Sequence, residues 1–268
     1  MKTYIIFRKI VAVCILLPAL FQFGFTQNQP DSTYTDFGVS VGLNNFQIQE
    51  KVLNNIRHSG FFPFLGFSYQ WFTEQIKQRV VLDFIVNMVK SRYEAETAPV
   101  IIDIALNYTQ IRKVSEYNPD LHLFLGGSGG LYSHMAFFDN WDDSHIYWLT
   151  YYYLGFNALL TYKNPLESCA YIELGIPLIS LVSRPPDRFL YKMLDDSFSW
   201  IISEIHRDLR LTTVHQHFVL NIDLGYKFKH SASFQQQVYW RISYTNTQLS
   251  YSKEVSLLTH IWGTTLLF

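Results

Sequence analysis

The sequence predicts an all-β protein, namely a closed antiparallel β-barrel that spans a membrane. We expect about ten strands, and any number from about eight to about twelve fits the pattern. Three observations support this fold class. Apolar residues alternate with small or polar residues along nearly the whole chain, short connections alternate with longer ones, and an apolar leader stands at the N-terminus. Together they predict an exported protein whose strands turn one face to lipid and the other to an enclosed interior.

Residues 1–26 have the anatomy of a signal peptide. Basic residues precede an uncharged apolar run at 10–25, which Pro18 shortens below the length of a comfortable membrane span. Small residues at the end of this run would allow cleavage before Gln27. We therefore expect a signal peptide at 1–26 and a single barrel domain at 27–268.

The composition disfavours several classes of protein. Aromatic residues make up 17% of the chain, the formal net charge is -1, and no basic stripe accompanies the aromatics, so a nucleic-acid partner is not expected. The expected mature chain keeps one cysteine, Cys169, so no internal disulfide is expected. A helical membrane protein is disfavoured because the uncharged segment 146–162 holds five tyrosines, which suit a strand better.

Each expected strand places an apolar column opposite a small or polar column. In the clearest segment, 99–114, Ile104 and Leu106 face one way while Asp103 and Asn107 face the other. A column that carries charge indicates a polar interior, as in a membrane barrel. In chain order, the expected strands are 36–46, 61–72, 78–90, 99–114, 121–134, 145–162, 168–182, 210–228, 234–248 and 255–268.

The connections distinguish a membrane barrel from a soluble sandwich, because periodicity alone does not. Short turns at one end, longer loops at the other and an even number of strands are typical of membrane barrels. An unpaired strand edge in hydrocarbon leaves backbone groups without hydrogen bonds, at a cost of several kcal/mol each, so the sheet must close. The short links are 73–77, 115–120, 163–167 and 229–233, and the mostly longer ones are 47–60, 91–98, 135–144, 183–209 and 248–254.

The C-terminal segment 259–268, THIWGTTLLF, ends in an aromatic residue and has strand period. Phe268, Leu266, Trp262 and Leu258 fall on one face. This ending resembles the closing strand of Gram-negative outer-membrane β-barrels. The resemblance implies residence in the outer membrane, contact with its lipid and lipopolysaccharide, and reading of Phe268 by the barrel assembly machinery. The leader and the aromatic-rich strands are similar to those of small barrels of Bacteroidota.

Two further predictions concern the ends of the barrel. The longest connection, 183–209, carries Phe198, Ile201 and Ile205 at helical spacing, which predicts a short amphipathic helix. The helix either covers the barrel mouth as a lid or turns its apolar face to the outer leaflet or to a partner protein. Aromatic residues near the expected strand ends predict interfacial girdles. The girdle residues are Trp71, Tyr132, Trp148, Tyr226, Trp240, Tyr244 and Trp262.

The inward columns predict a polar network in the lumen. A barrel of about ten strands is only slightly wider than one that its own side chains fill, so a wide channel is not expected. Buried charges need partners, so the network either stabilises the interior as ion pairs or lines a polar path for a small solute. The expected members are Arg79, Asp83, Asn87, Asp103, Asn107, Glu173, His215, His217, Asp223 and Arg241.

Three short motifs each have a specialised and an ordinary interpretation. His215 and His217 on one strand face would hold a metal if a third ligand came from a neighbouring strand; otherwise they bond to carboxylates. The glycine-rich run 126–130 matches the letters of a nucleophile elbow, but a strand follows it, which favours bending of the wall. The acidic loop 139–143 lacks the spacing of an EF-hand, which favours a solvated or lipopolysaccharide-facing loop. We expect no metal and no cofactor.

These observations favour a non-enzymatic membrane barrel: a structural or accessory component, or a narrow porin-like transport pathway. The alternative is a barrel hydrolase that acts on lipid or peptide. Barrel deacylases and phospholipases pair a histidine with a serine, and omptin proteases pair a histidine with aspartates. Here His58 precedes Ser59 and Ser133 precedes His134, but neither pair reproduces the phospholipase motif. No residue is therefore assigned a catalytic role, and both histidines are expected at the solvated rim.

Overall fold

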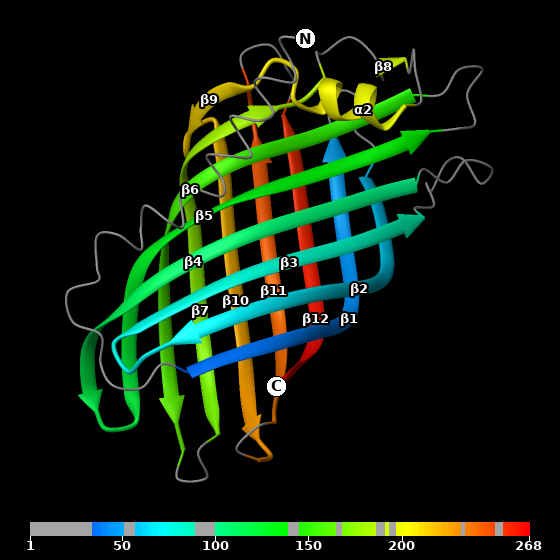
Figure 1. The fold of residues 1–268 in the computed structure, drawn as a ribbon. Coiled ribbons are helices and arrows are strands. Elements are labelled where there is room, and N and C mark those ends of the chain that lie inside the picture. The colour runs from blue at the N-terminus through cyan, green and yellow to red at the C-terminus, as the bar shows by residue number, and fades with distance from the viewer. Residues whose placement is uncertain are drawn as a thin grey trace.

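The computed structural model is a closed barrel of ten antiparallel strands, as predicted (Figure 1). It describes residues 34–50, 57–88, 100–138, 145–164, 168–185, 191–192, 197–231, 234–249 and 254–268. The expected signal peptide and the acidic loop lie outside these residues. The ring strands are β1 (Tyr34–Glu50), β2 (Arg57–Phe72), β3 (Ile76–Met88), β4 (Val100–Asn118), β5 (Leu121–Phe138), β6 (His145–Lys163), β7 (Cys169–Ser183), β10 (His217–Lys229), β11 (Gln235–Thr247) and β12 (Val255–Leu267). The remaining elements are β8 (Tyr191–Lys192), α2 (Phe198–Ile205) and β9 (Arg210–Thr213).

The first and last strands pair to close the ring. β1 and β12 are antiparallel neighbours over thirteen residue pairs. Beyond them, Phe37 and Phe268 exchange two backbone hydrogen bonds of 2.9 and 3.1 Å. Short connections such as the one after β4 lie at the end where β1 begins and the chain ends, which we call the turn end; the longer connections lie at the opposite, loop end (Figure 1). This asymmetry agrees with the predicted alternation of short and long links.

The apolar column of each strand faces outward and the polar column inward, as predicted. On β3, Leu82, Phe84 and Val86 are 41%, 41% and 43% exposed, whereas Asp83 between them is 6% exposed. On β4, Asp103 is buried in the same way. Charge inside and large apolar side chains outside is the inverse of a soluble protein and the arrangement of a membrane barrel.

One expected strand is two strands. The segment 210–228 is interrupted by a turn at 214–216, in which the Gln216 N–H donates to the Thr213 carbonyl at 2.9 Å. On the loop side of this turn β9 pairs with β7, and on the turn side β10 pairs with β7. The prediction of one continuous strand is wrong, because the alternation of apolar and polar side chains does not show where backbone hydrogen bonding between strands is interrupted.

The helix lies on the outer face of the wall, beside the loop ends of β5 and β6 (Figure 1). The side chain of Ser197 caps the first turn of α2. Ile205 packs with Met135 of β5 and with Ile146 and Trp148 of β6, all of which point away from the lumen. The predicted lid over the mouth is therefore wrong, and Ile205 faces the barrel's own wall rather than the outer leaflet or a partner protein, which was the other predicted position. Within the described part of the chain, no helix is both long and apolar enough to cross a membrane.

The helix also changes the expected aromatic girdle. Trp148 is 1% exposed beneath α2. Tyr132 points inward and lines a cavity in the lumen. Neither residue belongs to a girdle, whereas Trp240 and Trp262 are outward and exposed, as predicted. Position near a strand end therefore does not identify a girdle residue unless the side chain also faces outward and is left uncovered.

Candidate lumen site

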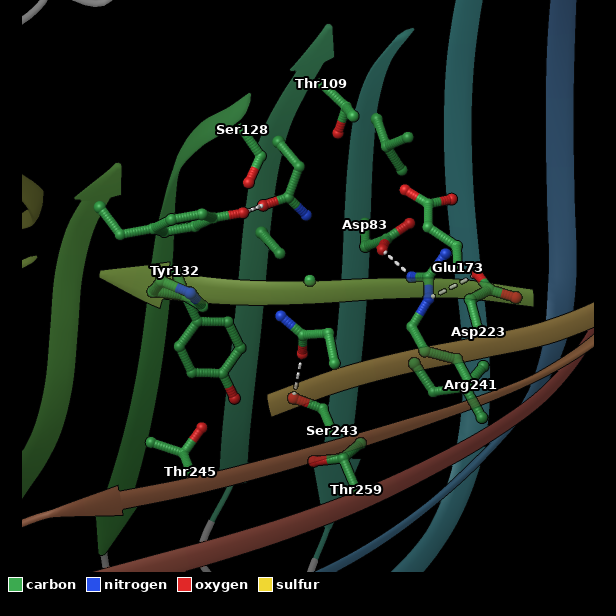
Figure 2. Close-up of a pocket in the computed structure, with 18 of the residues that line it drawn as sticks. Asp83, Thr109, Ser128, Tyr132, Glu173, Asp223, Arg241, Ser243, Thr245 and Thr259 are labelled. Atoms are coloured by element: carbon green, nitrogen blue, oxygen red, sulfur yellow. Dashed lines mark hydrogen bonds and ion pairs between the residues drawn. The ribbon is translucent and has the colours of Figure 1, made fainter. Parts of the chain in front are cut away.

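Side chains from several strands enclose a cavity of about 140 Å³ in the middle of the lumen (Figure 2). Successive residues of a strand point to opposite faces, so every second residue reaches this interior. The cavity wall holds four carboxylates and two guanidinium groups: Asp83, Asp103, Glu173, Asp223, Arg79 and Arg241.

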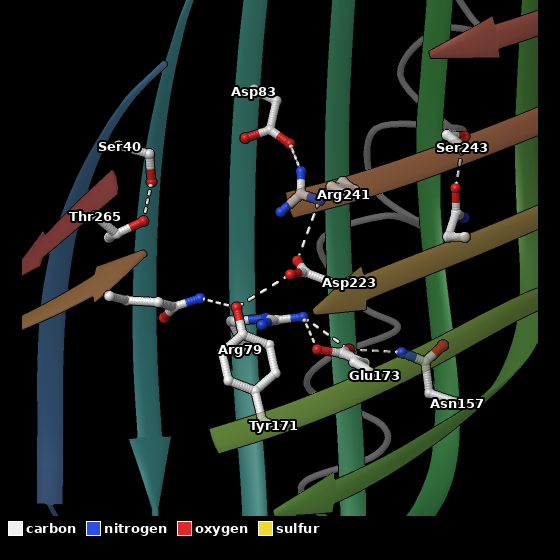
Figure 3. A network of polar contacts seen from close by, with 12 residues as sticks. Ser40, Arg79, Asp83, Asn157, Tyr171, Glu173, Asp223, Arg241, Ser243 and Thr265 are labelled. Carbon is white, nitrogen blue, oxygen red and sulfur yellow. Dashed lines mark hydrogen bonds and ion pairs between the residues drawn. The ribbon is translucent and has the colours of Figure 1, made fainter. Parts of the chain in front are cut away.

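Arg241 of β11 lies at the centre of a polar network (Figure 3). Its Nη1 donates to Asp83 Oδ2 at 2.6 Å, and its Nε donates to Asp223 Oδ2 at 3.3 Å. Tyr171 donates to the other oxygen of Asp223 at 3.0 Å, and Gln237 donates to the Tyr171 hydroxyl. One planar guanidinium group therefore connects β11 to carboxylates on β3 and β10.

A second ion pair lies near the first (Figure 3). Arg79 Nη2 is 2.8 Å from each carboxylate oxygen of Glu173, and Asn157 donates to one of these oxygens at 2.9 Å. The side chain of Glu173 is 9% exposed. Several donors on one buried carboxylate offset the cost of removing it from water.

Asp103 pairs with a histidine toward the loop end of the cavity. The distance from His134 Nδ1 to Asp103 Oδ1 is 2.6 Å, and His134 is 0% exposed. The expectation that His134 is a solvated rim group is wrong, because β5 continues to Phe138 rather than ending at 134. His134 Nε2 is buried and has no hydrogen-bond partner among the described residues.

The sequence neighbours do not form a catalytic pair with this histidine. Ser133 points to the opposite face of β5, where its Oγ lies 2.9 Å from Thr150 Oγ1. Ser128, in the glycine-rich run, lines the cavity from within a regular strand, so the strand-turn-helix of a nucleophile elbow does not form there. His58 belongs to β2, but its side chain lies outside the described part of the structure.

Apolar clusters pack against the polar centre, and Ile85, Leu257 and Ile261 of these clusters line the cavity itself. Toward the loop end, residues of β1 and β12 meet residues of β4, β5 and β6 from the facing wall. A second cluster draws on eight of the ring strands, from Ile261 beside Arg241 to Phe124 near the turn end. We call them the upper cluster (Phe46, Ile48, Ile101, Ala136, Tyr147, Val255 and Leu257) and the lower cluster (Phe64, Ile85, Ile111, Phe124, Leu159, Tyr171, Tyr239 and Ile261).

The other predicted network residues have different positions. Asn107 lines the cavity and accepts a hydrogen bond of 2.5 Å from the Tyr153 hydroxyl. His217 is buried, with its Nδ1 2.8 Å from Thr247 Oγ1. His215 is exposed in the turn before β10, so its prediction as a lumen residue and as the second imidazole of a metal pair is wrong. Asn87 is in β3, but its side chain lies outside the described residues.

Several members of the network were not expected from the sequence. Each of them is a polar residue on the inward column of a strand, which is a pattern visible in the sequence. Uncharged polar residues and tyrosines are common on strands, however, so this pattern alone does not identify a member of the network. Within the residues that the structure describes, no three His, Cys, Asp or Glu side chains gather as metal ligands would. The unexpected members are Tyr153, Asn157, Tyr171, Asn221, Gln237 and Ser243.

No known protein family and no curated protein matches the sequence. Similar solved structures include the outer membrane protease OmpT of Escherichia coli, at 11% identity and a TM-score of 0.44, covering 90% of this chain and 97% of that one. The translocator domain of the autotransporter NalP of Neisseria meningitidis has 11% identity and a TM-score of 0.41, with 96% and 97% covered. The attachment invasion locus protein Ail of Yersinia pestis has 10% identity and a TM-score of 0.40, with 87% and 99% covered. At these values, no residue role is transferred to this chain.

Proposed function

We propose that this chain is a non-enzymatic outer-membrane β-barrel whose lumen is closed along its axis, and that it serves as a structural or accessory membrane component. The observation that supports this most is the filling of the lumen from opposite walls. The upper cluster lies toward the loop end, and the lower cluster packs around the ion pairs of Arg79 and Arg241, with Ile261 and Leu159 as the register partners of Arg241 and Glu173. An interior packed in this way stabilises a small barrel without an open pore.

The outward apolar side chains support the membrane location. A closed ring has no unpaired edge, and its exposed face carries residues such as Phe84, Leu154 and Trp262. Such a surface is stable in hydrocarbon and costly in water. The partners that we propose are outer-membrane lipid and lipopolysaccharide, with Phe268 read by the assembly machinery. Fractionation of cells tests this location, because the chain should be found with the outer membrane. Purified protein that stays monodisperse in buffer without detergent would contradict the location.

Conductance in planar bilayers tests the closed lumen. Wild-type protein should give no channel events at any applied voltage. A variant in which the upper and lower clusters are both thinned, by Phe46→Ala and Phe124→Ala, should gain them if packing is what blocks the axis. Steady conductance of the wild type would instead support the narrow solute pathway. Of the hydrolase alternative, the described residues do not support the Ser133–His134 pair, because Ser133 faces away from His134, which contacts Asp103 instead.

A further inference from the structure

Three lysines stand on inward columns near the turn end, on the turn-end side of the ion pairs. Lys163 is the last residue of β6, Lys227 lies near the end of β10, and Lys77 lies near the start of β3. Each is an even number of residues from a cavity-lining residue of its own strand, so its side chain belongs to the inward face. We call Lys77, Lys163 and Lys227 the lysine cluster.

The lysine cluster faces one region of the lumen from opposite walls. In the strand ladders, Lys163 and Lys227 are the register partners of Cys169 on its two sides. These three residues therefore form one row across neighbouring strands, which lie about 4.8 Å apart. The ion pair of Arg79 joins β3 to β7 across the lumen, so β3 faces this row. Lys77 of β3 is two residues nearer the turn end than Arg79, and its charge repels those of the other two lysines.

The lysine cluster keeps an excess of positive charge. Within the described part of the chain, none of its ammonium groups forms an ion pair or a hydrogen bond. The ammonium group of Lys77 lies 4.0 Å from the centroid of the Phe124 ring instead. Asp36 of β1 attracts Lys227 without forming an ion pair with it. Glu173 also attracts the lysines, but its oxygens already accept from a guanidinium group and an amide.

A buried hydroxyl adds a second kind of donor beside the lysine cluster. Thr161 precedes Lys163 by two residues on the inward column of β6, and it is 4% exposed. Its Oγ1 has no hydrogen-bond partner among the described residues. Buried hydroxyl groups normally form hydrogen bonds, so this one is available to donate to a ligand that the neighbouring lysines attract.

A phosphate group matches this arrangement better than a carboxylate does. Lysine is a common phosphate ligand that acts as a compact point charge. Cations on opposite walls suit an anion that carries more than one negative charge and has oxygens in several directions, whereas a carboxylate is planar and singly charged. Because the lysines face the lumen and not the outer wall, the ligand arrives from water and not as a lipid headgroup. We propose that the lysine cluster and Thr161 bind inorganic phosphate or a small phosphate monoester at the turn end.

Cys169 reports on this site because it lies between two of the lysines. Cys14→Ser leaves Cys169 as the one thiol of the chain. Protein in detergent micelles is treated with a methanethiosulfonate that carries either a sulfonate or a trimethylammonium group, and each rate is divided by that of the same reagent with a small free thiol. We expect the anionic reagent to react about tenfold faster than the cationic one at low ionic strength. Inorganic phosphate should slow the anionic reagent several-fold, whereas acetate at equal ionic strength should not.

Variants assign the binding to the lysine cluster, with equilibrium dialysis of radiolabelled phosphate as a second readout. Lys77→Gln and Lys227→Gln should each weaken phosphate binding about tenfold. Lys163→Gln, at an exposed position, should weaken it without affecting folding, and Thr161→Val should weaken it several-fold. Arg112→Gln is the matched control, because Arg112 is exposed on the outward face of β4 near the turn end. Equal slowing by phosphate and acetate, equal loss in the Arg112→Gln control, or no bound label in the wild type would overturn the phosphate site. Slowing by phosphatidylglycerol in the micelles but not by phosphate would overturn the soluble ligand.

Discussion

Arg241 lies between carboxylates of two other strands. Replacing it therefore shows how much of the stability of the barrel comes from its charge and how much from its packing. Arg241→Met keeps an apolar stem but leaves Asp83 and Asp223 buried without this cation. Breaking a buried ion pair by removing one partner costs about 3 to 5 kcal/mol. We expect the variant in detergent to unfold at a clearly lower urea concentration, followed by tryptophan fluorescence. Adding Asp83→Asn and Asp223→Asn should recover most of the loss; no recovery would show that the guanidinium acts by volume.

Two glycines of one strand differ in what surrounds them. A Cβ on Gly130 would lie 2.4 Å from the carbonyl oxygen of Leu106, whereas the nearest atom to a Cβ on Gly127 is the carbonyl oxygen of Gly155 at 3.6 Å. Gly130→Ala must push β4 away and should cost about 1 to 3 kcal/mol of unfolding free energy. Gly127→Ala is the control and should be near neutral. Equal effects in urea titrations would argue against close strand approach as the reason for the glycine run.

For single residues, the sequence predicts which face of a strand a side chain occupies, but it is less able to predict which residue that side chain contacts. Period-two alternation correctly turned Asp83 and Asp103 inward, because it needs no knowledge of other strands. It could not show that His134 would meet Asp103, since the two residues belong to different strands and the expected end of β5 was placed too early. His215 was misplaced because a turn removes it from the column.

Among the elements, α2 depends on a neutral histidine. His206 follows the helix; its Nδ1 lies 2.7 Å from the Ile202 carbonyl oxygen and its Nε2 lies 2.5 Å from the Tyr152 hydroxyl of β6. If Nδ1–H donates to the carbonyl, Nε2 is left to accept from the tyrosine, which requires the neutral ring. Burial lowers the pKa of His206 below its ordinary value of 6.5.

The docking of α2 should therefore weaken in acid. A lowered pKa means that the docked helix resists a proton which the released helix accepts, so the stabilisation is complete above pH 6.5 and is lost as pH falls below it. Hydrogen exchange of 198–205, corrected for the intrinsic rate, should be faster relative to the barrel strands at pH 5.5 than at pH 7.5. His206→Gln cannot titrate and should remove the difference; a difference that persists in it would assign the effect to another group.

The same element shows why some of the structure was not predictable. Helical spacing of Phe198, Ile201 and Ile205 predicted the helix, because amphipathicity is a local property. Its position was predicted wrongly, because the surface that it covers, around Met135 and Trp148, is apolar in the same way as the lipid-facing surface. Nothing in the period of a strand tells an outward residue covered by protein from one covered by lipid.

For the whole molecule, closure was predictable from a general physical requirement, because hydrocarbon offers no hydrogen bonds to an open edge. The cross-lumen arrangement of the charges was not, because it depends on which strands face each other and how far the registers are staggered. The ring then joins residues that are distant in the chain, as when β1 pairs with β12. Closure of the ring therefore requires pairing between the first and the last strand of the barrel.

Variants of Phe268 distinguish two roles of this residue: closing the barrel through its backbone, and being recognised by the assembly machinery through its ring. Its backbone N–H and carbonyl both bond to Phe37, and its ring lies 5.6 Å from that of Phe234. Phe268→Ala keeps the two backbone bonds, so refolding into detergent micelles should resemble that of the wild type, measured by resistance of the folded band to cold dodecyl sulfate. In cells the same variant should accumulate less in the outer membrane if the assembly machinery reads the aromatic ring. Deletion of Phe268 removes the bonds as well and should impair both; poor refolding of Phe268→Ala in micelles would show that ring packing, rather than recognition, is the main role of this residue.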